Sequence, residues 1–335
     1  MSTSPTIGIA ITGSGSAAPV QFLDNDTLSQ VVETSDEWIA TRTGIKQRYL
    51  ATPAESISQI AATACQKALE MAKIDASEVD LIILASSTPD DLFGSACQIQ
   101  AAIGAKNAVA FDLTAACSGF IFGMVTAAQF LRSGVYRNVL VIGADILSRW
   151  VDWSDRTTCV LFGDGAGAVV MQATTAGDRW LGFEIRSDGT QNDCLNLPYQ
   201  GVDRTLTGEV VISQGTYKPM LMRGKEVYKF AVNKVPEVLE KALFRSNLSV
   251  AEVDWLLMHQ ANQRILDAVA QRLNVPPAKV ISNLAQYGNT SAASIPIALD
   301  EAVRSGKIKP GDAIATAGFG AGLSWGAAIF RWGAF

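Results

Sequence analysis

Short runs of continuous apolar residues alternate along the chain with longer segments in which apolar side chains recur every three to four residues. The runs Leu81 to Ala85 and Val139 to Ala144 have the length of buried strands. Segments of helical periodicity, such as the one around Gln66 to Leu69, separate them. This alternation is typical of βαβ units whose parallel or mixed sheet is covered by helices on both faces. The pattern therefore predicts an α/β fold.

The same series of elements occurs twice. Residues 66–84 match residues 240–258 at a constant separation of 174 residues. A second match follows in the same order, between Leu131-Arg-Ser-Gly134 and Val303-Arg-Ser-Gly306. Two matches in one order predict two duplicated halves of similar structure.

Each half contains one helix of small and apolar residues, at Ala115 to Gly123 and at Thr290 to Leu299. Because these helices are apolar on nearly every face, we expect them to be buried at the centre. Polar residues at 174–179 interrupt two apolar runs, and we expect the halves to join there. The sequence thus predicts an N-terminal half of residues 1–174 and a C-terminal half of residues 175–335.

Composition narrows the functional classes. The chain has 335 residues, of which 48% are hydrophobic and 18% charged, and its net charge is −5. No run of like charges forms a tail, so we expect neither a nucleic-acid partner nor attachment to a membrane. The N-terminus carries no signal or transit pattern, and the apolar runs are far shorter than the roughly 20 residues of a membrane span. Five cysteines without a C-x-x-C pair favour a reducing compartment. We therefore expect a cytoplasmic protein.

Three residues stand where chemistry is expected. Cys117 lies in the first turn of a small-residue helix, where the helix dipole favours a thiolate nucleophile; the alternative is a small buried residue. His259 follows the buried strand Trp255 to Met258, where it can act as acid, base or hydrogen-bond donor, or simply pack. It is the only histidine, so we expect no multi-histidine metal site. Asn289 precedes the second small-residue helix, where capping is the alternative role.

Two glycine-rich stretches call for interpretation. Gly13 to Ala18 follows a strand and resembles a dinucleotide fingerprint, but Pro19 stands where the phosphate-binding helix should begin. We interpret it as a turn, and an oxidoreductase function would rest on this stretch alone. Phe162 to Ala168 leads into a strand rather than a helix, which predicts close backbone packing at the centre.

The motifs taken together resemble the β-ketoacyl-acyl carrier protein synthase III enzymes, of the thiolase fold, over essentially the whole chain. The resemblance implies a five-layered αβαβα fold made of two related halves, and a homodimer. The motifs that carry it are Ser35-Asp-Glu-Trp-Ile-Ala-Thr-Arg-Thr-Gly-Ile45, Ala115-Ala-Cys-Ser-Gly-Phe120, Phe162-Gly-Asp-Gly-Ala-Gly-Ala168, His259-Gln-Ala-Asn-Gln-Arg-Ile265, Tyr287-Gly-Asn-Thr-Ser-Ala292 and Gly318-Phe-Gly-Ala-Gly-Leu-Ser-Trp325.

The resemblance assigns catalytic roles. Cys117 would take an acyl group from acetyl-CoA or another short acyl-CoA as a thioester. His259 and Asn289 would hold the malonyl-acyl carrier protein thioester while decarboxylation creates an enolate, which two neutral donors can stabilise. The backbone N–H groups of Cys117 and Ala321 would bind the tetrahedral intermediate. The product, acetoacetyl-acyl carrier protein, would initiate type II fatty-acid synthesis; acyl-CoA is a substrate, and no cofactor is expected.

The resemblance also assigns binding residues. Trp38 and Arg156 would sandwich the adenine of CoA; without the motif, a helix-surface tryptophan and a surface ion pair would be the simpler interpretations. Other expected CoA contacts are Arg42, Asn262, Thr34 and Gly224. A net basic segment at residues 222–245 could steer an acidic carrier protein through Lys229, together with Arg264 and Arg272, or be a solvated helix face.

Phe93 and Phe319 are expected at the acyl pocket, with Phe93 reaching across the dimer and favouring a short straight starter. One departure concerns Ala321, since family members often have a run of glycines after the phenylalanine, whereas this chain has Phe319-Gly-Ala-Gly322. Alternatives within the fold are a type III polyketide synthase and another secondary-metabolite condensing enzyme. Thiolase is disfavoured, because Asn289 stands where a second histidine is expected. A non-catalytic CoA-binding homologue is disfavoured by the retention of Cys117, His259 and Asn289.

Overall fold

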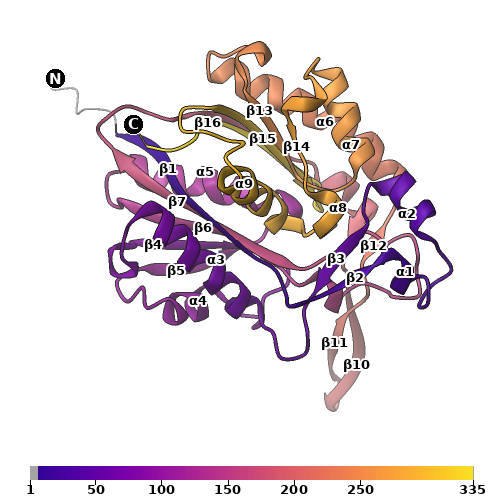
Figure 1. Ribbon diagram of the computed structural model, residues 1–335. Coiled ribbons are helices and arrows are strands. Elements are labelled where there is room, and N and C mark those ends of the chain that lie inside the picture. Colours follow the sequence, from indigo (N-terminus) through magenta and orange to yellow (C-terminus); the bar gives the residue numbers. More distant parts are fainter. Residues whose placement is uncertain (1–6, 335) are drawn as a thin grey trace.

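Two five-stranded mixed sheets form the framework of the protein (Figure 1). The computed structural model describes residues 7–334. The first sheet has the order β1 (Gly8–Ala17), β7 (Gly165–Thr174), β6 (Asn138–Asp145), β4 (Leu81–Ala85), β5 (Val109–Leu113). The second sheet has the order β14 (Val280–Ile281), β13 (Trp255–Met258), β15 (Ala313–Gly320), β16 (Ser324–Arg331), β8 (Trp180–Ser187).

Helices form three layers around these sheets. Two of them, α5 (Gly119–Arg132) and α9 (Ser294–Arg304), pack between the sheets in one continuous core (Figure 1). The outer face of the first sheet is covered by α3 (Ile57–Ala72) and α4 (Ala96–Ala102). The outer face of the second sheet is covered by α6 (Gly224–Arg245) and α7 (Gln263–Arg272). The predicted αβαβα order and the burial of the two small-residue helices are confirmed.

The strand directions bring several loops to one place. In the first sheet β4 is parallel to both β5 and β6, so the carboxyl ends of these three strands share an edge. In the second sheet β13 is parallel to β15. Residues that follow parallel strands at their carboxyl ends are the usual components of ligand sites in α/β folds. We therefore expect the ligand site among the loops that follow β4, β5, β6, β13 and β15.

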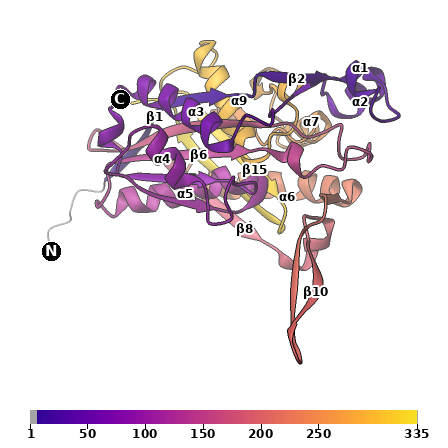
Figure 2. The ribbon, with the colours of Figure 1, turned by 90° about the horizontal axis from the view of Figure 1, so that it is seen from below.

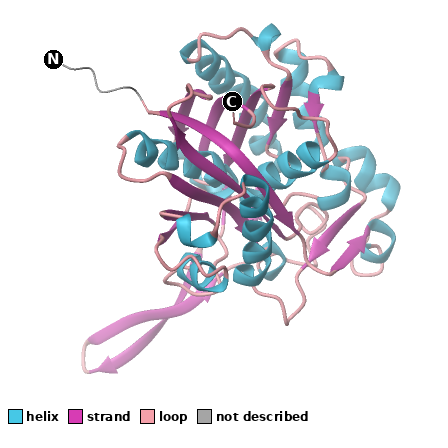
Figure 3. Cartoon of the chain, turned by 60° about the vertical axis from the view of Figure 1, so that its left-hand side comes forward, coloured by secondary structure: helices cyan, strands magenta, loops and turns pink. Residues whose placement is uncertain are grey.

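Smaller elements surround this framework. A hairpin of β10 (Tyr199–Thr207) and β11 (Val210–Tyr217) projects from the body with every residue exposed (Figures 2 and 3). The other short strands and α-helices are β2 (Gln21–Asp24), β3 (Gln47–Leu50), β9 (Leu195–Asn196), β12 (Leu221–Met222), α1 (Asn25–Leu28), α2 (Asp36–Thr43) and α8 (Leu284–Tyr287). The 3-10 helices are η1 (Ala76–Glu78), η2 (Ala116–Ser118), η3 (Leu147–Arg149), η4 (Gly189–Cys194), η5 (Val250–Glu252), η6 (Pro277–Lys279) and η7 (Ser291–Ala293).

The interpretation of Gly13 to Ala18 as a turn is wrong. Residues 8–17 form the single strand β1, with a bulge between Ile11 and Gly13. The glycines serve packing, because a Cβ atom on Gly13 would lie 2.2 Å from the carbonyl oxygen of Ala68 in α3. The second glycine-rich stretch does enter a strand, β7, as predicted. That strand ends at Thr174, and the chain resumes in the other sheet at Trp180.

Candidate active site

A cavity of about 1090 Å³ opens where the loops of the two sheets meet. Its lining is mostly apolar, and it brings together Cys117, His259 and Asn289. These residues come from η2 after β5, from the end of β13, and from the turn before η7. A large apolar pocket with a few convergent polar groups is the usual form of a small-molecule site.

Cys117 occupies a tight turn between β5 and α5. The preceding Ala116 has φ of 46°, and Gly119 begins α5. The end of β15 lies directly against this turn, because a Cβ atom on Gly320 would be 2.6 Å from the backbone nitrogen of Cys117. Only glycine at position 320 allows this approach, which brings the backbone after β15, including Ala321, to the nucleophile.

The expectation that Cys117 favours the thiolate is not supported. The pKa of its thiol is raised to about 12, mainly by burial; the nearby Asp145 carboxylate acts in the same direction and the Ser291 hydroxyl in the opposite one. The helix N-terminus is present, but the side chain is only 8% exposed. Desolvation disfavours an anion more than one helix end stabilises it. The thiol is therefore protonated before substrate binds.

His259 is held in the neutral state. Burial lowers the pKa of its imidazole to about 3. Its Nδ1 lies 2.6 Å from the Ser294 hydroxyl oxygen, which also accepts the backbone N–H of Gln260. Since the Ser294 hydroxyl has no other acceptor among residues 7–334, it donates to Nδ1, and the ring proton resides on Nε2. His259 thus presents a neutral N–H donor to the cavity.

Asn289 is oriented by its own backbone surroundings. Its Oδ1 accepts the N–H of Ser291 two residues on, at 2.9 Å, which closes a turn before η7; the N-cap of η7 is Thr290, so the alternative capping role is wrong. The Asn289 backbone N–H donates to Leu161, and its carbonyl accepts from Gly163. Because Oδ1 faces the turn, the Nδ2 amide on the opposite side of the planar group remains available as a donor in the cavity. The turn that Asn289 forms with Ser291 is therefore compatible with a functional role of its amide.

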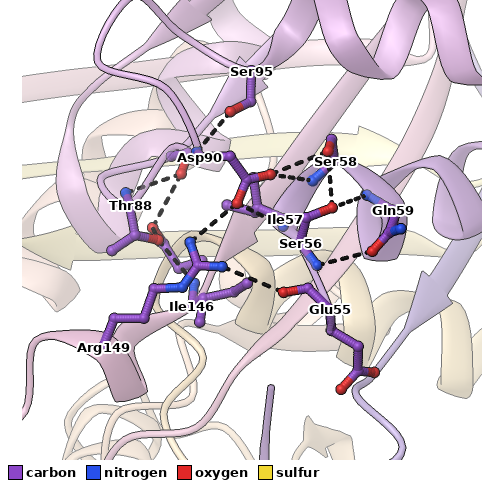
Figure 4. A network of polar contacts seen from close by, with 12 residues as sticks. Glu55, Ser56, Ile57, Ser58, Gln59, Thr88, Asp90, Ser95, Ile146 and Arg149 are labelled. Carbon is purple, nitrogen blue, oxygen red and sulfur yellow. Dashed lines mark hydrogen bonds and ion pairs between the residues drawn. The ribbon is translucent and has the colours of Figure 1, made fainter. Parts of the chain in front are cut away.

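A buried carboxylate lies behind this site and was missed by sequence reasoning. Asp145 ends β6 and accepts hydrogen bonds from Ser87 N–H, from the Thr88 hydroxyl and from Ala292 N–H. Thr88 Oγ1 also accepts the backbone N–H of Ile146, a contact visible in Figure 4 beside the neighbouring network of Asp90. The signal available in the sequence was an aspartate that ends a predicted buried strand.

Charged residues gather at the mouth of the cavity. The Cζ of Arg42 lies 4.5 Å from the centre of the Trp38 ring, and that of Arg156 lies 5.3 Å from it. Arg156 also donates to the backbone carbonyl of Glu33. At 5.3 Å the guanidinium is already in cation–π contact with the indole, which leaves no room for a third ring. A base stacked between Trp38 and Arg156 would have to displace the arginine.

Of the other residues expected to contact CoA, some line the cavity and one does not. Gly224 and Asn262 line the cavity, and the Asn262 side chain accepts the N–H of Arg264 at the start of α7. Thr34 does not line the cavity; its hydroxyl is buried and makes no hydrogen bond within residues 7–334. The structure thus brings two of these three residues to the cavity itself.

The basic segment is partly neutralised. Lys234 and Lys241 both form ion pairs with Glu237, at 2.9 and 3.0 Å. Arg264 lines the cavity mouth, Lys229 is exposed on α6, and Arg272 donates to Val232 and Asn233. Arg223 and Arg245 are also paired, with Asp193 and Glu184. Within the described part of the chain, the lysines of this segment without an ion pair are therefore Lys225, which lines the cavity, and Lys229, one helical turn further on.

The two phenylalanines expected at the acyl pocket lie in different places. Phe319 lines the cavity and contacts His259 edge to face, with ring centres 5.4 Å apart. Phe93 is 98% exposed and does not line the cavity of its own chain. Its neighbour Leu92 is 82% exposed. A single protomer therefore leaves an exposed apolar tip at this loop.

Among residues 7–334, no helix combines the length and the apolar character that a membrane span requires. Within the same range no three His, Cys, Asp or Glu side chains are grouped as metal ligands.

Comparison with known proteins identifies close relatives. The family described as 3-oxoacyl-[acyl-carrier-protein (ACP)] synthase III matches residues 111–189, and its C-terminal counterpart matches residues 243–332. The beta-ketoacyl-[acyl-carrier-protein] synthase III of Acaryochloris marina is 70% identical over 325 residues, which are 97% of this chain and 98% of that protein.

Solved structures agree. The 3-oxoacyl-[acyl-carrier-protein] synthase III of Aquifex aeolicus VF5 is 44% identical, with a TM-score of 0.90 over 97% of this chain and 100% of that chain. The priming beta-ketosynthase of the R1128 polyketide pathway has the same TM-score of 0.90 at 32% identity, over 99% of this chain and 98% of that one. The fold is therefore shared more widely than the sequence.

Proposed function

The chain belongs to the β-ketoacyl-[acyl-carrier-protein] synthase III family, and from that premise we propose how its residues perform the condensation. The chain is accordingly an acyltransferase of the condensing-enzyme class that acts at the start of fatty-acid biosynthesis. The proposal concerns the substrates, which are acetyl-CoA or another short acyl-CoA and malonyl-acyl carrier protein, and the roles of Cys117, His259 and Asn289. The observation that carries it is their convergence in one apolar cavity.

In the first half-reaction, Cys117 attacks the acyl-CoA thioester. A new S–C bond forms to Cys117 and the S–C bond to CoA breaks, so the products are acyl-Cys117 and CoA. The backbone N–H groups of Cys117 and Ala321 stabilise the oxyanion of the tetrahedral intermediate. The contact between the β15 end and the Cys117 turn supports this pairing.

In the second half-reaction, His259 and Asn289 hold the malonyl thioester oxygen. Loss of carbon dioxide leaves an enolate whose negative charge grows on that oxygen, and two fixed donors lower its energy. The Nε2–H of a neutral His259 and the Nδ2–H of Asn289 meet this requirement. The carbanion then attacks the acyl carbon of acyl-Cys117, the S–C bond to Cys117 breaks, and the released thiolate takes up one proton from solvent.

CoA enters between α2 and the loop that carries Arg156 in this proposal. Its adenine replaces the Arg156 guanidinium on Trp38, Arg42 contacts the phosphates, and Asn262 and Gly224 flank the pantetheine. Thr34 does not line the cavity and has no direct contact with CoA in this proposal. The positions of Trp38, Arg42, Arg156, Asn262 and Gly224 around the cavity support this path.

The carrier protein would dock beside the same mouth. Lys229 and Arg264 supply positive charge there, with Arg272 farther along α7. The ion pairs of Lys234 and Lys241 with Glu237 support a docking area limited to the cavity side. An acidic carrier protein is attracted by such a patch even though the chain as a whole is negative.

We further propose a homodimer in which Phe93 of one protomer closes the acyl pocket of its partner. The exposure of Leu92 and Phe93 and the position of β5 at a sheet edge support this arrangement. The pocket would then favour a short straight starter. A panel of acyl-CoA starters, with acyl-Cys117 measured by mass spectrometry, tests it; a higher kcat/KM for isobutyryl-CoA than for acetyl-CoA contradicts it.

The central test separates the half-reactions. Radiolabelled acetyl-CoA should label the unaltered protein but not Cys117→Ala. The His259→Ala variant should still be labelled at Cys117 and should fail to decarboxylate malonyl-acyl carrier protein. Labelling of Cys117→Ala would remove the assigned nucleophile, and normal decarboxylation by His259→Ala would remove the assigned donor.

A further inference from the structure

Two serine hydroxyls meet beside the proposed oxyanion hole. Ser118 follows Cys117 in η2, and Ser324 begins β16. Their Oγ atoms lie 2.8 Å apart, and both side chains are buried. One serine belongs to the segment that follows β5 of the first sheet, and the other belongs to the second sheet. The serine pair, Ser118 and Ser324, therefore connects the two sheets at the cavity.

Each hydroxyl of the serine pair also binds a backbone carbonyl. Ser118 Oγ donates to the Ala115 carbonyl oxygen at 2.7 Å, and Ser324 Oγ donates to the Ala321 carbonyl oxygen at 3.0 Å. Ser324 Oγ also lies 3.3 Å from the Ala115 carbonyl oxygen. Two hydroxyl protons are shared among these contacts, so the loss of either hydroxyl disturbs all of them. The serine pair thus ties the turn that carries Cys117 to the loop that carries Ala321.

The loop that carries Ala321 has few other restraints. The next residue, Gly322, has φ of 132°, a backbone conformation that side chains rarely allow. Within residues 7–334 no group besides the Ser324 hydroxyl donates to the Ala321 carbonyl. The next attachment is at Leu323, whose N–H and carbonyl both pair with the backbone of Asp188. The Ser324 hydroxyl is therefore the contact that restrains the loop at Ala321 itself.

Both proposed oxyanion-hole donors are available to a ligand. The backbone N–H groups of Cys117 and Ala321 donate to no acceptor within residues 7–334, and both residues line the cavity. Such donors stabilise an oxyanion when they are held around the position that the negative oxygen will occupy. The Cys117 turn is itself strained, because Ala116 has φ of 46°. The separation of the two donors therefore depends on contacts that hold the turn and the loop together.

We infer that Ser118 and Ser324 are positioning residues that set the separation of the two oxyanion-hole donors. The inference rests on the proposed function, and in particular on the roles of the Cys117 and Ala321 N–H groups. The serine hydroxyls are engaged with each other and with backbone carbonyls. They therefore act on the reaction through the backbone and not by contact with the substrate.

The serine pair should matter for one kind of step only. Acylation and condensation both pass through a tetrahedral intermediate at the acyl carbon on Cys117, so both need the two donors in place. Decarboxylation of the malonyl thioester depends instead on His259 and Asn289. The side chains of these two residues form no hydrogen bond with the serine pair in the described structure. Loss of a serine hydroxyl should therefore slow acylation and leave decarboxylation unchanged.

The experiment compares Ser324→Ala and Ser118→Ala with the unaltered protein. Single-turnover formation of acyl-Cys117 from acetyl-CoA measures acylation. Release of carbon dioxide from malonyl-acyl carrier protein by unacylated protein measures decarboxylation. Removal of a whole oxyanion-hole donor costs about 100- to 1000-fold in rate, whereas a displaced donor is still present, so acylation should be about tenfold slower in each variant. The half-saturating concentration of acetyl-CoA should not change, because the lost interaction belongs to the transition state.

The double variant tests whether the serine pair acts as one unit. If the two hydroxyls are coupled, Ser118→Ala combined with Ser324→Ala should acylate about as slowly as either single variant, which is about tenfold slower than the unaltered protein. Independent effects would multiply to about 100-fold.

Ser14→Ala is the matched control. Ser14 is fully buried in β1, and its hydroxyl donates to Asp300 in α9 at 2.9 Å, away from the residues that line the cavity. Its removal should lower thermal stability without changing the rate of acylation or decarboxylation. If Ser324→Ala does not fold, Ser118→Ala carries the test with the same two assays.

The outcomes are distinct. Acylation at the unaltered rate in either single variant overturns the inference. Equal losses of acylation and decarboxylation indicate a general structural effect and also overturn it. A change confined to the half-saturating concentration of acetyl-CoA, or losses that multiply in the double variant, overturns it as well. If the unaltered protein forms no acyl-Cys117 at all, the proposed function fails instead.

Discussion

Removal of the Ser294 hydroxyl should impair condensation without impairing acylation. In Ser294→Ala, Nδ1 of His259 loses its partner at 2.6 Å, and the backbone N–H of Gln260 loses its acceptor at 3.2 Å. The hydroxyl fixes the tautomer that carries the proton on Nε2. The Ser294 hydroxyl forms no hydrogen bond with Cys117 in the described structure, so the reaction of Cys117 with acyl-CoA should continue.

The size of the effect follows from the environment of the ring. The imidazole pKa of about 3, against an ordinary value of about 6.5, corresponds to roughly 5 kcal/mol against the imidazolium. The variant therefore keeps a neutral ring, because burial and not Ser294 causes this shift. A neutral hydrogen bond contributes about 1 kcal/mol, equivalent to about fivefold in the population of the correct tautomer and orientation. The rate of malonyl decarboxylation should fall about five- to tenfold.

The assay exploits the single histidine. Protein labelled with ¹⁵N-histidine has one pair of ring nitrogens. Their shifts should report an unprotonated Nδ1 and no titration between pH 5 and 8 in the unaltered protein, and a mixture of tautomers in Ser294→Ala. Single-turnover acylation and decarboxylation are measured on the same samples. A proton on Nδ1, a midpoint near pH 6.5, or equal losses in both half-reactions would refute the reasoning.

Three other predictions concern ligands and pH. Trp38→Ala should raise KM for acetyl-CoA about tenfold at unchanged kcat; a change confined to kcat would contradict adenine stacking. Lys229→Glu should raise KM for malonyl-acyl carrier protein several-fold, whereas Lys241→Glu, whose lysine is paired with Glu237, should not; equal effects would argue against a localised patch. Between pH 7.5 and 5.0 the unaltered protein should lose about 2 kcal/mol of unfolding free energy relative to His259→Asn, because only the unfolded histidine gains a proton there. Urea unfolding of both proteins at both pH values measures this difference.

The layered fold was predictable because its signals are local. Buried strands such as Leu81 to Ala85 appear as continuous apolar runs, and α5 is apolar on nearly every side. Gly13 was misinterpreted because a glycine required by a helix packing on a strand has the same local signature as one in a turn. What distinguishes them is the contact with Ala68, which lies 55 positions away.

The site was predictable only in part. Cys117, His259 and Asn289 were found from their places at element ends and from the motifs. Asp145 and Ser294 were missed, because their roles arise from hydrogen bonds between segments that are distant along the chain. The protonated state of Cys117 also depends on three-dimensional burial, which no sequence pattern reports.

The cavity lies where the two sheets meet, so a ligand bound there should affect the stability of the folded protein. Cys117 comes from the segment after the first sheet's β5, whereas His259 and Asn289 come from segments of the second sheet. A molecule bound in the cavity therefore contacts both, and it can bind only while they are correctly assembled. By mass action, such a ligand at 100 times its dissociation constant adds about 2.7 kcal/mol to the free energy of unfolding. Substrate supply would then regulate the lifetime of the enzyme as well as its rate.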